Sequence, residues 1–150
     1  MTILKGMAWD HSRGYDPMVA TANEFKKKNS DYEIIWEKRS LQAFADRPIE
    51  QMTSDYDFMV IDHPHVGEAS RKGLLLELNH YEKYQKNLDI LSKQSVGLSH
   101  KSYEFSNNQY ALAIDSAAPV SAYREDLIDK IPRTYEDVIR LAEVKKVMWP

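Results

Sequence analysis

Three short apolar segments, separated by stretches with helical spacing, dominate the first sixty residues. We interpret residues 2–9, 32–37 and 57–62 as strands. The last of them, Asp57-Phe58-Met59-Val60-Ile61-Asp62, is nearly continuous in apolar residues. Strands of this kind are usually buried on both faces of a parallel sheet. The order strand, helix, strand, helix, strand therefore predicts an α/β fold with a doubly wound, mostly parallel sheet.

The helices between these strands have recognisable boundaries. Asp16 can cap a helix that has Pro17 at its first position. The run Lys26-Lys27-Lys28 falls in the last turn of that helix, where the dipole favours cations. A second helix is expected over residues 43–53, with Pro48 at or near a helix start.

Shorter elements are expected in the second half of the chain. We predict a loop or short helix at 64–71, an extended piece at 74–78, a helix at 81–91, a turn at Asn107-Asn108, a strand at 110–115 and a short helix at 124–129. The last helix starts after Thr134 as N-cap, with Asp137 three residues on, which is a variant of the capping box.

Composition excludes several classes of protein. A hydrophobic share of 43% is enough for a packed core and argues against disorder. The 20 basic and 23 acidic residues are interspersed, so no basic face is expected for nucleic acid. The absence of cysteine excludes disulfides, Cys-ligated zinc and thiol catalysis within these residues. No apolar run approaches the ~20 residues of a membrane span.

Polar pairs follow two of the expected strands. In open α/β sheets, ligands bind outside the carboxyl ends of the strands, where the strand order reverses. We expect strands 2–9 and 57–62 to be neighbours across that point. The pairs Asp10-His11 and Asp62-His63 would then face one crevice. Carboxylates accept hydrogen bonds from hydroxyls and imidazole can donate or accept, so such a crevice suits a polar ligand.

Three further side chains extend this candidate site. Trp9 offers a flat apolar face for a sugar or another ring. Arg13 and Arg39 could hold a carboxylate or a phosphate in bidentate fashion. Each residue also has a purely structural interpretation, since an Asp at a strand end often caps the next helix and Arg39 could form a surface ion pair.

Catalytic and metal chemistry have weaker signals. Asp62, His63 and His65 have the ligand types of zinc, but His63-Pro64-His65 is expected to be extended, so its side chains diverge. There is no Gly-x-Ser-x-Gly elbow and no phosphate-binding Gly-rich loop, and 5 glycines disfavour a dinucleotide fold. We expect that the chain binds no metal and no cofactor and is not an enzyme. A metal-dependent or acid/base hydrolase that uses the Asp-His pairs stays open as the alternative.

Three motifs occur in a consistent order. They are Leu4-Lys5-Gly6-Met7-Ala8-Trp9-Asp10-His11-Ser12-Arg13-Gly14-Tyr15-Asp16-Pro17, then Tyr56 to His65, then Tyr110 to Tyr123 followed by Pro132-Arg133-Thr134-Tyr135-Glu136-Asp137. Together they resemble the extracellular solute-binding proteins of family 1, which have the type II periplasmic-binding fold and serve carbohydrate ABC transporters. Tyr135 stands where the family pattern has Trp.

The resemblance implies a two-lobed protein of which this chain covers half or less. Residues 1–113 would form an incomplete first lobe, and residues 114–150 the crossover and the truncated start of the second. Without returning segments, the chain is expected to be marginally stable and to leave part of its core open, including Val60, Ile61, Leu112 and Ile114.

The resemblance also implies a function. A small polar, sugar-like ligand would be captured by hinge closure, without catalysis, and delivered to the membrane permease of an ABC transporter. The location would be periplasmic or extracellular, although the start of the chain lacks the apolar stretch of a signal peptide and leaves a cytoplasmic one open. By this carry-over, the ligand contacts are Trp9, Asp10, His11, Arg13, Arg39, Asp62, His63 and Asp115.

Overall fold

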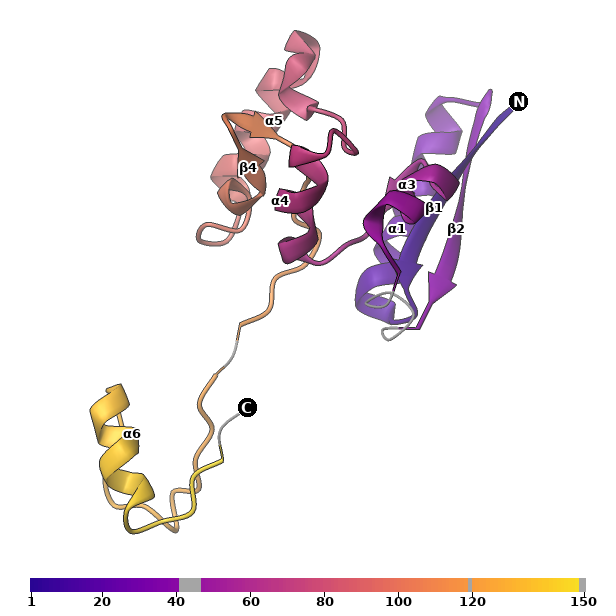
Figure 1. Ribbon diagram of the computed structural model, residues 1–150. Coiled ribbons are helices and arrows are strands. Elements are labelled where there is room, and N and C mark those ends of the chain that lie inside the picture. Colours follow the sequence, from indigo (N-terminus) through magenta and orange to yellow (C-terminus); the bar gives the residue numbers. More distant parts are fainter. Residues whose placement is uncertain (41–46, 119, 149–150) are drawn as a thin grey trace. The chain divides into compact units, whose positions relative to one another are not determined.

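The protein is described from a computed structural model, which describes residues 1–40, 47–118 and 120–148. The chain divides into two units, Met1–Ser116 and Ala117–Pro150 (Figure 1). The lobe boundary expected at 113/114 concerns a two-lobed protein and stays a prediction. Part of the helix expected at 43–53 lies outside the described residues.

The first unit contains a three-stranded parallel sheet. Its strands are β1 (Thr2–Trp9), β2 (Tyr32–Arg39) and β3 (Phe58–Met59), in the order β2-β1-β3. β1 pairs with β2 along its whole length, in the register Thr2↔Tyr32 to Trp9↔Arg39. The mixed α/β class, the parallel strands and the adjacency of the first and third strands are confirmed. A complete doubly wound lobe of type II stays a prediction.

The third strand is shorter than the expected 57–62. It pairs with β1 only at Gly6↔Phe58 and Met7↔Met59. The backbone N–H of Val60 makes one more hydrogen bond to the carbonyl of Met7, at 2.8 Å. The chain then leaves the sheet and enters α4 (His63–Arg71), which the sequence allowed as a loop or short helix.

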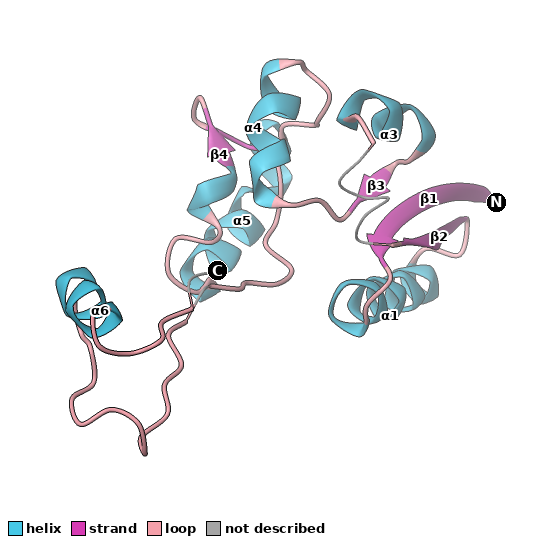
Figure 2. Cartoon of the chain, turned by 60° about the horizontal axis from the view of Figure 1, so that its bottom comes forward, coloured by secondary structure: helices cyan, strands magenta, loops and turns pink. Residues whose placement is uncertain are grey.

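The two faces of the sheet are packed by different helices. Figure 2 shows α1 (Ser12–Lys28) and α3 (Ile49–Asp55) on opposite sides of the sheet. Because side chains alternate along a strand, Met7 points to the α3 side and Gly6 to the α1 side. The fully buried Met7 belongs to the core cluster, which consists of Met7, Ile49, Met52, Tyr56 and Ala69.

On the α1 side, the Trp36 indole lies across Gly6. A Cβ atom at position 6 would come within 2.5 Å of that ring, so only glycine fits beneath it. The Trp36 ring centroid lies 6.3 Å from that of Phe58. Glycine at the middle of β1 thus lets a large aromatic side chain from the neighbouring strand cover this face.

The start of α1 corrects an expectation. The helix begins at Ser12 with His11 as N-cap, not at Asp16. The His11 Nδ1 atom accepts a hydrogen bond from the Arg13 backbone N–H at 3.1 Å, which satisfies one free donor of the first turn. Pro17 therefore lies inside the helix, where its missing N–H removes one hydrogen bond. The three lysines fall in the last turn, as predicted.

The rest of the first unit consists of short elements. They are η1 (Leu78–His80), α5 (Glu82–Gln94), η2 (Lys101–Tyr103) and the antiparallel hairpin of β4 (Glu104–Phe105) and β5 (Asn108–Gln109). The hairpin turn is Ser106-Asn107, where both residues have positive φ, 51° and 66°, as a type I′ turn requires. The turn expected at Asn107-Asn108 is thus one residue out of register.

Two expected elements are absent from the described chain. Residues 110–115 form no strand, and residues 124–129 form no helix but a turn with a hydrogen bond from the Leu127 N–H to the Arg124 carbonyl at 3.0 Å. Of the extended piece expected at 74–78, residues 74–77 have neither helix nor strand, and Leu78 begins η1. A strand forms only beside a partner strand. The Tyr110 N–H donates to the Tyr103 carbonyl at 3.2 Å, but none of the described strands pairs with 110–115. Leu112 and Ile114, which we expected to belong to the part of the core left open, are 43% and 41% exposed, whereas Val60 is buried.

The second unit contains one helix, α6 (Tyr135–Ala142), in its described part. Its predicted cap is confirmed. The Thr134 hydroxyl accepts from the Asp137 N–H at 3.2 Å, and the Asp137 carboxylate accepts from the Thr134 N–H at 3.1 Å. None of the described residues of this unit is buried, so α6 has an apolar side without a core beneath it.

Candidate functional site

The carboxyl ends of β1 and β2 lie side by side and carry the first group of candidate residues. Trp9 ends β1 opposite Arg39 at the end of β2. The chain then turns tightly. The Asp10 N–H donates to the Arg39 carbonyl at 2.7 Å, and the His11 N–H donates to the Trp9 carbonyl at 2.8 Å. This turn places Trp9, Asp10, His11 and Arg39 around one end of the sheet, as the sequence predicts.

The Trp9 side chain is half-buried and is held by α1. A Cβ atom at the buried Gly14 would come within 2.3 Å of the indole, so the ring lies directly on the helix backbone. The His11 ring is stacked near it, with ring centroids 6.2 Å apart and planes inclined by 20°. Two rings are therefore positioned beside the strand ends.

Two ion pairs involve residues that neighbour Trp9 and His11 along the chain. The Lys38 ammonium lies 3.0 Å from the Asp10 carboxylate and 4.5 Å from the centre of the Tyr15 ring. The hydrogen bond that the Lys38 ammonium donates to the Asp10 carboxylate raises the pKa of Lys38 above its ordinary value. Arg13 forms an ion pair with Asp115, whose side chain is 29% exposed. Asp115, predicted as a ligand contact, is thus brought to the first turn of α1 from far along the chain.

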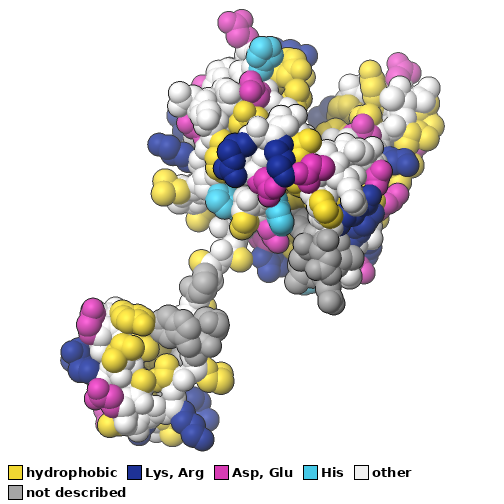
Figure 3. Space-filling view, viewed as in Figure 1, with side chains coloured by type: hydrophobic (Ala, Val, Ile, Leu, Met, Phe, Trp, Pro, Cys, Tyr) yellow, Lys and Arg dark blue, Asp and Glu magenta, His cyan; other side chains and the backbone are white. Residues whose placement is uncertain are grey.

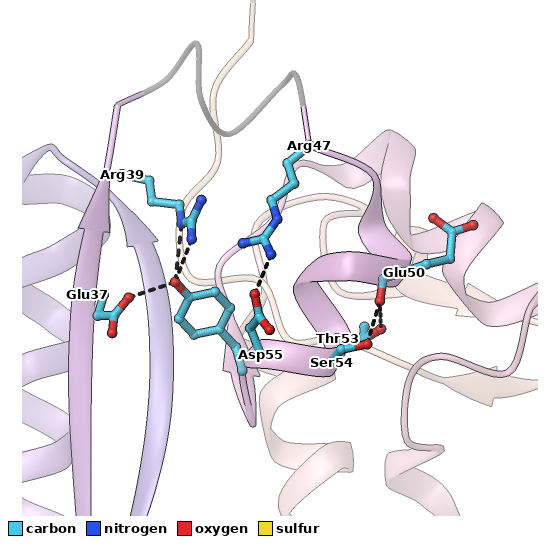
Figure 4. A network of polar contacts seen from close by, with 8 residues as sticks. Glu37, Arg39, Arg47, Glu50, Thr53, Ser54 and Asp55 are labelled. Carbon is cyan, nitrogen blue, oxygen red and sulfur yellow. Dashed lines mark hydrogen bonds and ion pairs between the residues drawn. The ribbon is translucent and has the colours of Figure 1, made fainter.

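Arg39 is engaged in a different network, drawn in Figure 4. Its guanidinium donates to the Tyr56 hydroxyl at 2.7 Å, and that hydroxyl donates to the Glu37 carboxylate at 2.7 Å. Beside them Arg47 forms an ion pair with Asp55. Tyr56 is buried, so the network ties the end of β2 to the end of α3. The structural interpretation of Arg39 is therefore the better supported one.

The second Asp-His pair lies at the start of α4. Asp62 is the N-cap residue, but its side chain makes no capping hydrogen bond. The His63 Nε2 atom lies 2.8 Å from the Ser102 carbonyl and therefore acts as donor, and its ring is 5.2 Å from that of Tyr103. Burial, and next the charge of Asp62, raise the pKa of Tyr103.

The two Asp-His pairs have separate neighbours. Within residues 1–40, 47–118 and 120–148, no hydrogen bond or ion pair joins Asp10-His11 to Asp62-His63. A single crevice lined by both pairs stays a prediction. The same described ranges contain no group of three or more His, Asp or Glu side chains that could hold a metal ion.

Several residues of the site were missed by the sequence analysis. Lys38 contacts both Asp10 and the Tyr15 ring. Tyr56 accepts a hydrogen bond from Arg39 and donates one to Glu37. Lys38 could have been proposed from the sequence, since it adjoins Arg39 at the end of β2. Tyr56 had no comparable signal, because a tyrosine before an apolar strand is ordinarily packing.

The wider surface agrees with the composition. On the face in Figure 3, cationic and anionic side chains of the first unit lie beside one another and form no patch of one sign. Lys72, for example, pairs with both Glu50 and Glu68. Among the described helices, none has the length and apolarity needed to cross a membrane.

Comparison with known proteins adds no family to this description: no protein-family model matches the chain, and no curated protein is similar to it.

Proposed function

We propose that the chain is the solute-binding component of an ABC transporter and captures a small polar, sugar-like ligand without catalysis. The observation that carries this proposal is the arrangement at the carboxyl ends of β1 and β2. There, the half-buried Trp9 ring packs on α1, and the neighbouring residues Asp10 and Arg13 form the pairs Lys38–Asp10 and Arg13–Asp115. A polyhydroxylated ring binds well to an aromatic face that has hydrogen-bond donors and acceptors near it.

The pairing of charges favours a neutral ligand. Each carboxylate, Asp10 and Asp115, already has a cation beside it. An anionic ligand that approached Arg13 would have to displace Asp115, whereas a hydroxyl can donate to a carboxylate and accept from a cation without separating the pair. A sugar therefore fits these contacts better than a sugar phosphate does.

The remaining candidate residues have graded roles in the proposal. His11 combines the cap of α1 with a ring beside Trp9. Among the described residues, the Asp62 carboxylate makes no capping hydrogen bond, whereas His63 is bonded to Ser102 and Arg39 to Tyr56. Ligand capture by hinge closure between two lobes, delivery to a membrane permease and a periplasmic or extracellular location belong to the same proposal.

The proposal is tested by adding sugars to the 15N-labelled chain and recording amide and indole NMR signals. Neutral mono- and disaccharides should move the Trp9 indole N–H and the amides of residues 10–13 and 115 in a saturable way. The matching sugar phosphates should do so at several-fold higher concentration. Signals that stay fixed for every sugar, or a preference for the phosphates, would contradict the proposal.

Variants locate the contacts. Trp9→Ala should abolish the shifts, while Tyr84→Ala, a change at an exposed aromatic residue of α5, should leave them. Asp62→Ala should weaken binding by about 1–3 kcal/mol if Asp62 accepts a buried hydrogen bond from the ligand, and unchanged binding would leave it only as the N-cap of α4. Appearance of a product in the sugar spectrum would overturn binding without catalysis in favour of the hydrolase alternative.

A further inference from the structure

A small pocket lies beside the C-terminal end of α5. It has a volume of about 140 Å³ and is lined by Leu91, Gln94, Ser95, His100, Leu112 and Ala113. All six residues belong to the first unit. The volume is close to that of the cavity of about 150 Å³ that accommodates a benzene molecule in another protein. The pocket can therefore hold a single ring but not a sugar dimer or a nucleotide.

The frame of the pocket is held by hydrogen bonds of the backbone and of Gln109. The His100 N–H donates to the Ser95 hydroxyl at 2.9 Å. The buried Gln109 side chain donates to the carbonyls of His100 at 3.0 Å and of Ala111 at 2.7 Å. These bonds fix the backbone on both sides of the pocket, so its walls are positioned before any ligand arrives.

The His100 imidazole is the unused polar group of this frame. The residue is 9% exposed, and within the described ranges neither ring nitrogen has a hydrogen-bond partner. In the same ranges, the only buried side-chain polar atom that is both sealed from solvent and unpartnered is Trp36 Nε1, so the imidazole keeps access to its surroundings. A neutral imidazole offers one donor and one acceptor.

We propose that this pocket binds a small neutral amphiphile, a single ring with one hydroxyl group such as a phenol. The ring would pack against Leu91, Leu112 and Ala113, and the hydroxyl would hydrogen-bond to the His100 imidazole. No Asp, Glu, Lys or Arg lines the pocket, which disfavours a charged ligand because its desolvation would be uncompensated. None of the six lining residues is among the proposed sugar contacts.

The test is an NMR titration of the 15N-labelled chain with phenol, toluene and benzoate. Phenol should give saturable shifts at residues 91–95, 100 and 111–113, with roughly 2- to 10-fold tighter binding than toluene, because only phenol makes the hydrogen bond. Benzoate should give no saturable shift at these residues. Equal binding of phenol and toluene, or linear shifts spread over the exposed apolar residues, would overturn the proposal.

Two variants separate the pocket from unspecific binding. Ala113→Leu fills the pocket from an irregular segment and should abolish the phenol shifts, whereas Ala117→Leu makes the same change at an exposed position outside it and should not. His100→Phe should remove the preference for phenol over toluene. If that variant fails to fold, Ala113→Leu still decides, since phenol binding that survives it refutes the proposed location.

Discussion

Replacement of Gly14 by alanine tests how Trp9 is held. An ideal Cβ atom at position 14 would lie 2.3 Å, 2.5 Å and 2.6 Å from three carbons of the indole. Carbon atoms prefer a separation of about 3.5 Å or more, so the ring must retreat by about 1.2 Å, the difference between 3.5 and 2.3 Å. Overpacking of this kind costs about 1–3 kcal/mol.

A second effect opposes the clash. Alanine is favoured over glycine inside a helix by about 0.5–1 kcal/mol. Since Trp9 is half-buried and can swing outward, we take a middle value for the clash and expect a net loss of about 1 kcal/mol in the free energy of unfolding. Urea unfolding followed by circular dichroism measures this loss, and the indole N–H signal of Trp9 should shift because the ring moves.

The control for this prediction is Asn23→Ala. Asn23 is an exposed residue of α1, so alanine should raise the stability by a few tenths of a kcal/mol through helix propensity alone. If Gly14→Ala raises the stability as the control does, and the Trp9 signal stays in place, the close packing of indole on helix backbone is refuted. The same result would remove the main support for Trp9 as a positioned ligand contact.

Two other predictions concern the polar network and the last helix. Tyr56→Phe removes a buried hydroxyl that joins Arg39 to Glu37 and should lower the free energy of unfolding by about 1–3 kcal/mol. The control Tyr123→Phe, at an exposed tyrosine, should leave the free energy of unfolding unchanged. Equal stability of the two variants would argue against the network. Hydrogen bonds from the Arg133 N–H, Arg140 and the Thr134 N–H lower the pKa of Asp137 well below its ordinary 3.8, so its contribution to α6 is present above pH 3.8 and is lost as the pH falls further. Carbon chemical shifts of residues 135–142 should show this loss of helix, and Thr134→Ala should reduce the helix already at neutral pH, by about 1 kcal/mol; shifts that stay constant down to about pH 2 would contradict the pH dependence.

The first part of the sheet could be predicted because its patterns are local. β1 occupies the predicted residues 2–9, and β2 extends the predicted 32–37 by two residues. The cap of α6 was equally local, since Thr134 and Asp137 satisfy each other without any other element. The predicted start of α1 was wrong for a related reason. An imidazole is not among the usual capping side chains, whereas the carboxylate of an aspartate such as Asp16 is.

The errors lie where an element depends on distant partners. The segment 110–115 has the composition of a strand, yet a strand forms only beside another, and none of the described strands pairs with it. Its Asp115 nevertheless reaches Arg13, a contact that no local pattern encodes. The rule that parallel strands end at one edge of the sheet brought Trp9, Asp10, His11 and Arg39 together, and they lie at the ends of β1 and β2. The contact of His63 with Ser102 depends on η2, which the sequence pattern did not predict.

The Trp36 indole that lies across Gly6 also constrains which sequences can share this sheet. A methyl group at position 6 and an indole at position 36 exclude each other, since the two would be within 2.5 Å. A smaller residue at position 36 would remove the restriction at position 6. Alanine or valine at position 6 could then fill the space that the indole leaves. The two positions are therefore expected to covary in homologous chains, and Gly6→Ala combined with Trp36→Leu should be less harmful than the sum of the two single changes.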